Sequence, residues 1–524
     1  MRLPWKIAIG VSLISIVAAI RLFSSNNRAQ VAAEKTRRDL QREGFKVDFS
    51  EWNFTASPEA RARAADITLA AEACRSFWRR DMFMLMRPVA TNAAIPVFQQ
   101  EHVTTEFGTD FWSDLRSGFQ PHTATLDRAC AAALAGKIEF EPVKGPSGEP
   151  VFTQPGDMRA FALALSSRTL VDLHDGHRPQ ALTNLLALTC LVTRWQPGPA
   201  EISQMVRMSC IPQVMRTTWE AFQFCEWTDD ELGLLQREWE QTEFLKTLPE
   251  TAAFERANVA FACRRERAQP TGRGVPLKQV VMELGDSPAR AWSDFTAGAR
   301  EEKYRETGIF EDERVLLLYY RDQETQLYQA LNARTWLAMR SLPGVTNIPS
   351  APQFTERQLS LINSLPRNPY FVRPSFATRV AEAEARRRLL VTAIALERYK
   401  GRHHNFPESL DSLVPELLKT AEVDFIDGEP LRYKRTEDGR FLCYSIGIDC
   451  IDQGGQMTEP ESNSSKSDGS ARRRREPDLV WPLPATRTQI EIFNEQDRNS
   501  QKERQAQPRR RYGLAPRAEA TSSK

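Results

Sequence analysis

The stretch that decides the fold is Gly156–Trp195, GDMRAFALALSSRTLVDLHDGHRPQALTNLLALTCLVTRW. Its first half repeats apolar side chains at i, i+3, i+4 and i+7, the spacing of one helix face, with Met158, Phe161, Ala162 and Leu165. The segment Asp175–Pro179 contains Gly and Pro and ends that helix, and a second apolar series begins at Leu182. Because two helices joined by a short loop must lie antiparallel, the stretch predicts a helical hairpin.

Further helices are predicted downstream of this hairpin. A third covers about 200–226, after the break at Gln196–Pro199. Thr228 and Glu231 have the spacing of a capping box and open a fourth helix, and Pro249–Glu250 can open a fifth. A long helix is expected over about 312–340. The pattern predicts a mainly α fold, with a helical-hairpin bundle or array over residues 156–345.

The segments on either side of this bundle are less regular. Residues 28–56 read as a charged linker that contains at most a short helix. Residues 57–155 predict a helix from Ser57 to about Met86. Irregular chain with one hairpin is expected over about 90–155, where stretches such as Lys137–Glu141 alternate. Residues 346–374 are interpreted as a second linker.

An apolar run, Ile7–Ile20, lies near the amino terminus between Lys6 and Arg21. A cleaved signal peptide and an uncleaved membrane anchor both fit a basic start followed by an apolar stretch. We favour an anchor over residues 1–27, with 3–23 in the membrane, because the Val17–Ala19 triplet lies inside the apolar run. Basic residues flank the span on both sides and leave the orientation open. Since a first span of this kind usually exports the chain after it, we expect most of the protein outside the cytoplasm.

The carboxy-terminal third begins with a predicted helix over 375–400, which Gly401 is expected to end. It continues with FPESL (406–410), LVPELL (413–418) and DGEPLRY (427–433). Two strands are predicted next, joined at Thr436–Gly439, where Asp-Gly suits a tight turn. FLCYSIGIDC (441–450) closes the series.

This order of motifs over about residues 380–484 resembles the globular domain of the type II secretion major pseudopilin, which is similar to the ends of large planctomycete and verrucomicrobial envelope proteins. The resemblance implies a small α+β domain over 375–484. It also implies a calcium loop, here with Asp449 and Asp452 as ligands, and hard carboxylate oxygens suit calcium. The middle region weakly resembles a tetratricopeptide hairpin, although no second copy occurs at a 34-residue period.

Two features depart from the pseudopilin pattern. The chain has no prepilin-peptidase site before its apolar run, and a polar low-complexity insert, 456–477, interrupts the expected calcium loop. Ordinary turn residues are therefore the favoured interpretation of Asp449 and Asp452. A basic tail, 485–524, is predicted to be disordered; its Arg509–Arg511 could contact anionic lipid, but a solubilising tail is favoured.

Composition excludes several classes of protein. The chain has 524 residues, with 70 Lys and Arg against 68 Asp and Glu, and so lacks the basic excess of a dedicated nucleic-acid binder. Motifs of serine hydrolases, zinc proteases and nucleotide-binding loops are missing from the sequence. His174 and His177 are three residues apart, but Gly176 and Pro179 break helical geometry, so a solvated turn is favoured over a metal site.

These observations predict a single-pass protein of the bacterial inner membrane with its bulk in the periplasm. We expect an interaction or scaffold protein with an unknown protein partner. A catalytic site, a small-molecule substrate and a nucleic-acid partner are not predicted, and calcium is the one cofactor considered. An envelope enzyme of hydrolase type, with an unrecognised site in 90–155 and the helical bundle, is one alternative. A component of secretion or pilus-like assembly is another.

Overall fold

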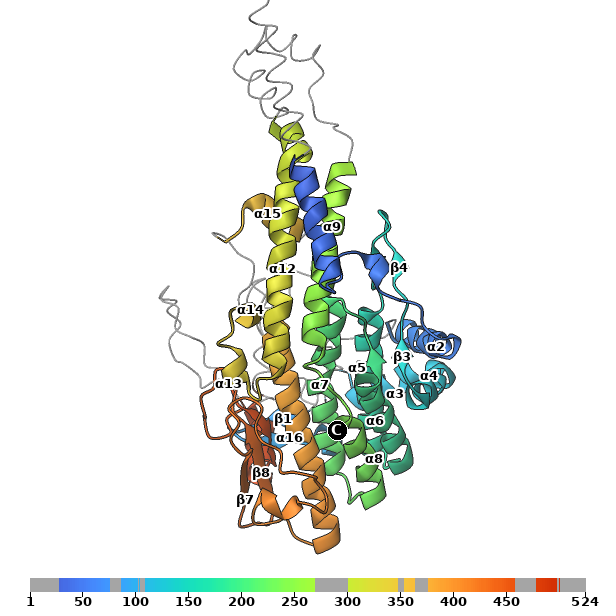
Figure 1. The fold of residues 1–524 in the computed structure, drawn as a ribbon. Coiled ribbons are helices and arrows are strands. Elements are labelled where there is room, and N and C mark those ends of the chain that lie inside the picture. The colour runs from blue at the N-terminus through green and yellow to red at the C-terminus, as the bar shows by residue number, and fades with distance from the viewer. Residues whose placement is uncertain are drawn as a thin grey trace, which may run out of the picture.

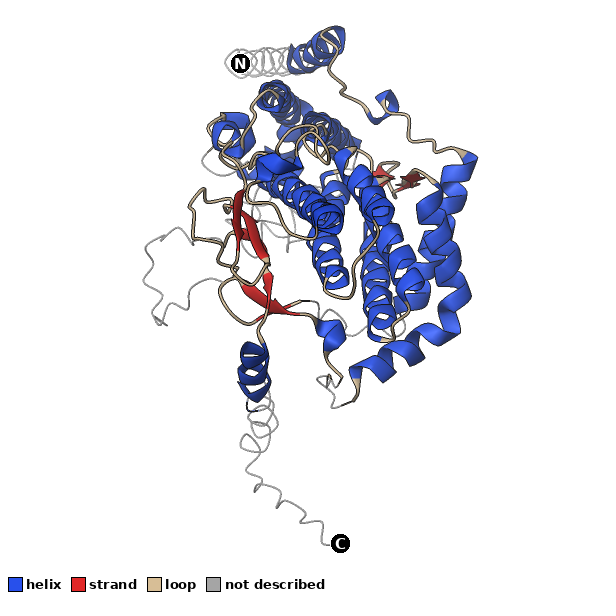
Figure 2. Ribbon diagram, turned by 90° about the horizontal axis from the view of Figure 1, so that it is seen from below, coloured by secondary structure: helices blue, strands red, loops and turns tan. Residues whose placement is uncertain are grey.

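The computed structural model describes residues 28–75, 86–101, 103, 109–268, 300–346, 353–362, 376–457, 477–496 and 499. The chain is mainly α, as predicted (Figures 1 and 2). The central helices are α5 (Pro155–His174), α6 (Arg178–Thr193), α7 (Glu201–Phe222), α8 (Asp229–Glu240) and α9 (Thr247–Ala268). The first two form the predicted hairpin and pack on each other and on α7.

The start of α8 follows directly from its sequence. The Thr228 hydroxyl accepts a hydrogen bond from the Glu231 backbone N–H, and the Glu231 carboxylate accepts one from the Thr228 N–H. This capping box is the one predicted, and it satisfies two donors that a helix start leaves unpaired. The last predicted helix of the bundle is shorter than expected. Helix α12 (Ile309–Leu331) ends before a turn, and α13 (Trp336–Met339) starts anew at a Thr335 cap.

Three helices make a long arm at one end of the molecule: residues 28–42, α9 and α12 (Figure 1). We call this arm the stalk. The Glu313 carboxylate on α12 is fully buried and is held by Arg37 of the first helix and by Arg267 of α9. Residues 28–42, predicted to be either a charged linker or a short helix, thus form a packed helix, and the rest of the segment 28–56 contributes the 3₁₀ turn η1 (Phe49–Glu51). A π-helical turn, η5 (Tyr304–Gly308), precedes α12, and α15 (Glu356–Ile362) packs on α9.

The segment before the hairpin forms helices that pack against it. They are α2 (Pro58–Arg75), α3 (Phe111–Phe119) and α4 (Thr123–Ala135), with 3₁₀ turns η3 (Val97–Gln99) and η4 (Gln120–His122). The hairpin expected within about 90–155 is β4 (Val143–Lys144) with β5 (Pro150–Val151). Strand β3 (Ile138–Glu139) instead pairs in parallel with β6 (Trp195–Gln196), a partner distant in sequence.

The carboxy-terminal unit is built on α16 (Phe376–His403), which packs on α7 and α8. Strands β7 (Arg432–Arg435), β8 (Phe441–Ser445) and β9 (Leu479–Trp481) form an antiparallel sheet beside this helix. The predicted turn is confirmed, with Gly439 at φ 75°. The prediction that Gly401 ends the helix is wrong. The helix continues to His403, and His404 takes the positive φ of 64° that ends it.

The unit is joined to the rest of the chain by a second sheet. Strand β10 (Leu483–Pro484) pairs in parallel with β2 (Ala93–Ile95), which pairs antiparallel with β1 (Arg87–Pro88). One cluster of buried apolar side chains extends from Ile67 to Trp481. The bundle, the segment before it and the carboxy-terminal unit therefore share a hydrophobic core.

Several predictions concern residues outside the described part of the chain. They include the membrane anchor 1–27 and most of the insert 456–477. None of the described helices is both long and apolar enough to span a bilayer. The tail prediction is wrong at its beginning, where 487–496 form a helix; beyond residue 499 it lies outside the described residues.

Candidate functional site

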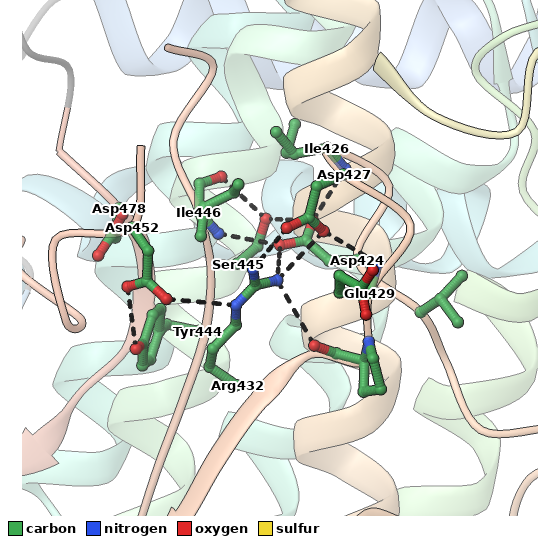
Figure 3. A network of polar contacts seen from close by, with 12 residues as sticks. Asp424, Ile426, Asp427, Glu429, Arg432, Tyr444, Ser445, Ile446, Asp452 and Asp478 are labelled. Atoms are coloured by element: carbon green, nitrogen blue, oxygen red, sulfur yellow. Dashed lines mark hydrogen bonds and ion pairs between the residues drawn. The ribbon is translucent and has the colours of Figure 1, made fainter. Parts of the chain in front are cut away.

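A cluster of charged side chains lies at the end of the β7–β8 hairpin away from its turn (Figure 3). Its centre is Arg432, the first residue of β7, whose side chain is 21% exposed. One guanidinium nitrogen donates to Asp424 at 3.2 Å and to Asp427 at 3.2 Å. The other terminal nitrogen also donates to Asp427, and Nε lies 3.5 Å from Asp452. One arginine thus contacts three carboxylates from two loops.

The hairpin register places Arg432 in this position. Arg432 lies opposite Tyr444 in the β7–β8 pairing, so the two side chains share one face of the sheet. The Tyr444 hydroxyl donates to Asp452 at 3.1 Å. Burial, and then Asp452, raise the pKa of Tyr444 to about 12, so the hydroxyl keeps the proton it donates.

Asp424 is the buried member of the cluster, with no exposed surface. Its carboxylate accepts from the Ile426 and Ile446 amides, both at 2.9 Å, and from the Ser445 hydroxyl at 2.7 Å. With Arg432 as the fourth donor, its lone pairs are fully used. Burial raises the pKa of Asp424, against the effect of these hydrogen bonds.

Asp449 and Asp452, the predicted calcium ligands, lie in the loop after β8. Asp449 accepts from the Ile451 amide at 3.1 Å and from the Gln453 side chain at 3.1 Å, one donor on each oxygen. Asp452 accepts from the Gly454 amide at 2.8 Å in addition to Tyr444. These are the contacts of turn residues.

Asp478, from the chain just before β9, binds the same loop. Its carboxylate is 4% exposed and accepts from the Gln453 and Gly455 amides at 3.1 and 2.8 Å. Calcium needs six to eight oxygen ligands with lone pairs directed at the ion. Here those lone pairs face N–H and O–H donors, and a guanidinium occupies the space between the carboxylates. The residues as they stand do not fit a calcium site.

The other histidine and cysteine candidates have structural surroundings. His174 Nδ1 lies 2.8 Å from the Phe98 carbonyl, and its ring stacks on Trp112 at 4.0 Å. His177 Nδ1, in the turn after α5, lies 3.8 Å from the Asp172 carboxylate. All eight cysteines lie among the described residues as free thiols, and burial raises the pKa of most of them. Within the described ranges, His, Cys, Asp and Glu form no group suited to a metal ion.

A groove of about 470 Å³ lies between α2 and the start of α5. Charged residues line it, and they are largely paired with one another: Arg75 with Asp157, and Arg61 with Glu141 at 3.7 Å. Burial raises the pKa of Asp157, and Arg75 opposes this effect. This groove lies partly in the segment that the enzyme hypothesis named.

No protein-family model, curated protein or solved structure matches the chain.

Sequence reasoning did not select Arg432, Asp424 or Asp478. A signal was nevertheless present, because Arg432 is two residues from Pro430 in the DGEPLRY motif and Asp427 begins that motif. The turn at Asp438-Gly439 fixes the strand register, and this register could have placed Arg432 beside Tyr444 and the following loop.

Proposed function

We propose that this protein is a single-pass protein of the bacterial inner membrane that acts as a scaffold. In this proposal the stalk holds the helical body away from the bilayer, and the carboxy-terminal unit contacts a protein partner in the periplasm. The observation that carries the proposal is the direction of the stalk.

That direction follows from two sets of contacts. Arg37 of the first helix pairs with Glu313, which also pairs with Arg267, near the end of α9 and the beginning of α12. Further along the chain, the Lys46 carbonyl accepts from Arg256, which also pairs with Glu324 at 2.6 Å. Residue 28 therefore lies at the end of the stalk where α9 ends, and the carboxy-terminal unit lies at the opposite end of α12 (Figure 1).

The predicted membrane span, 3–23, precedes residue 28 by only a few residues. If it crosses a bilayer, the free end of the stalk faces that bilayer. The 23 residues of α12 correspond to about 35 Å at about 1.5 Å per residue. The carboxy-terminal unit would be held at least that far from the lipid surface.

Apolar side chains remain exposed at this far end. Leu337 and Ile451 are 48% and 45% exposed. They lie on segments in contact, because the Leu337 N–H donates to the Ile426 carbonyl and Arg340 contacts Cys450. Exposed apolar side chains on adjoining segments suit contact with another protein.

A photo-cross-linking side chain placed in the full-length protein tests the proposal in cells. We expect lipid adducts from position 31, at the free end of the stalk, and a protein adduct of reproducible mass from position 451. Position 69 on α2 is a matched control, because Val31, Leu69 and Ile451 have similar exposed fractions of 52%, 49% and 45%. Position 31 without lipid adducts would contradict the membrane anchor. Positions 337 and 451 without a protein adduct would contradict the scaffold role.

The two alternatives have distinct outcomes. A component of secretion or pilus-like assembly would cross-link to copies of itself and give a ladder of oligomers. An envelope enzyme is favoured by one observation, the groove between α2 and α5. Its test is a hydrolase-substrate screen of the purified protein, with Asp157→Asn as the variant that should abolish any turnover found and Asp127→Asn, outside the groove, as the control.

A further inference from the structure

We propose that Arg432 is the built-in cation of the carboxy-terminal loop, so that this loop is ordered by a guanidinium and not by a metal ion. This proposal is independent of the scaffold role and of the membrane anchor. It concerns the loop in which the sequence predicts calcium. There the positive charge that balances the carboxylates comes from Arg432.

The cluster brings three carboxylates together. Asp424, Asp427 and Asp452 converge on one point between the two loops (Figure 3). Three carboxylates at one site repel each other unless a cation lies among them. Arg432 lies among them, and its fork of five donors can serve several carboxylates at once, which a single point charge does less well.

The carboxylate lone pairs of Asp424 and Asp478 already accept hydrogen bonds from the protein. Asp424 has four donors, which is the full capacity of a carboxylate, and Arg432 is the only charged one among them. Asp478 is occupied by backbone amides of the same loop. A metal ion would have to displace both the guanidinium and these amides before it could gain ligands.

Arg432 and Asp427 also stabilise each other in their charged forms. The hydrogen bonds that Arg432 donates to Asp427, followed by the charges of Asp427 and Asp424, raise the pKa of Arg432. Burial acts to raise the pKa of Asp427, but the Arg432 hydrogen bond and the Glu429 amide outweigh it, and the net pKa is lowered. Both partners are therefore held in their charged forms, as a resident ion pair requires.

The experiment is hydrogen exchange of the full-length protein, followed by mass spectrometry in the peptides that cover 422–432 and 444–457. Wild-type protein in calcium and in chelator should exchange at the same rate. Arg432→Gln removes the charge and should speed exchange in both peptides on the order of tenfold, because charged partners lose their hydrogen bonds. Arg435→Gln is the control; this residue lies at the other end of the same strand, and its pair with Glu408 is exposed.

Calcium added to the Arg432→Gln protein distinguishes a missing cation from a general loss of packing. We expect millimolar calcium to restore part of the protection in this variant alone, because the carboxylates then lack a counter-charge. Any of three results would overturn the proposal: calcium-dependent protection in the wild type, equal exchange in the Arg432 and Arg435 variants, or no response of Arg432→Gln to calcium.

Discussion

Trp219 of α7 donates a hydrogen bond from its indole Nε1 to the backbone carbonyl of Pro482, 2.9 Å away and 263 residues later in the sequence. Both groups are buried. Pro482 joins β9 of the carboxy-terminal sheet to β10, which pairs with β2. This contact therefore lies where the bundle, the carboxy-terminal unit and the earlier part of the chain meet.

Trp219→Phe should destabilise the fold because it leaves the Pro482 carbonyl buried without its donor. Trp239→Phe is a matched control: Trp239 is equally buried, but its Nε1 has no hydrogen-bond partner among the described residues. We expect the first substitution to cost about 1–2 kcal/mol more than the second. Urea unfolding of both variants measures the difference, and equal midpoints would show that the hydrogen bond contributes nothing.

Glu220, the next residue of α7, predicts a pH dependence. Its fully buried carboxylate accepts from the Met86 and Val97 amides at 2.8 and 2.9 Å and holds the chain beside β1 and β2. Burial raises the pKa of Glu220 to about 7, although these hydrogen bonds oppose the shift. Since the folded pKa exceeds the unfolded one, its contribution to stability is complete below about pH 4.5 and is lost as the pH rises through about 7.

Glu220→Gln should remove this slope. Between pH 5 and 8 the wild-type protein should lose about 2.5 kcal/mol relative to the variant. Melting temperatures across that range measure the effect, and the exposed Glu226→Gln provides the control. Parallel curves for wild type and Glu220→Gln would rule out this titration.

Glu313 predicts how the stalk is held together. Its buried carboxylate lies between two guanidinium groups, so Glu313→Gln leaves both Arg37 and Arg267 without their buried counter-charge. We expect a loss of about 3–5 kcal/mol and faster hydrogen exchange in residues 28–42. Glu311→Gln, an exposed position on the same helix, should leave both unchanged. Equal effects of the two substitutions would contradict the role of this cluster.

Arg207 is a buried arginine that caps a helix. It donates to the Val192 and Thr193 carbonyls at the end of α6, at 2.7 and 3.4 Å, and lies over the Phe244 ring. Burial lowers its pKa to about 10, so it remains charged at neutral pH. Arg207→Met should cost about 2–3 kcal/mol in thermal unfolding, and Arg207→Lys less, because the amine still reaches one carbonyl. A methionine variant as stable as wild type would exclude this role.

Local patterns predicted much of the fold. The Thr228 capping box and the Asp438-Gly439 turn need only neighbouring residues, and both formed as predicted. The helix end at Gly401 was predicted wrongly because a glycine can remain helical when the residues after it are held in place. Arg402 pairs with Asp229 and Glu416, and His404 supplies the positive φ instead. Strand β10 could not be foreseen, since a two-residue strand has no periodicity and its partner lies far away in sequence.

The candidate site was harder to predict than the fold. Asp449 and Asp452 were selected by resemblance, and their proximity to Arg432 depends on the pairing of β7 with β8. Asp424 and Asp478 come from loops without a regular pattern. Their convergence is a product of tertiary structure, which a single sequence does not display.

The pairing of Leu483 with Ala93 also has a consequence for the time course of synthesis. At roughly 5–20 residues per second, the ribosome makes the second strand of this pair tens of seconds after the first. Until then β2, whose Ala94 and Ile95 end as buried side chains, pairs with β1 alone and lacks its parallel partner β10. For most of its synthesis the chain therefore has an unpaired strand edge at β2. We expect a chaperone that binds short apolar segments to bind residues 93–98.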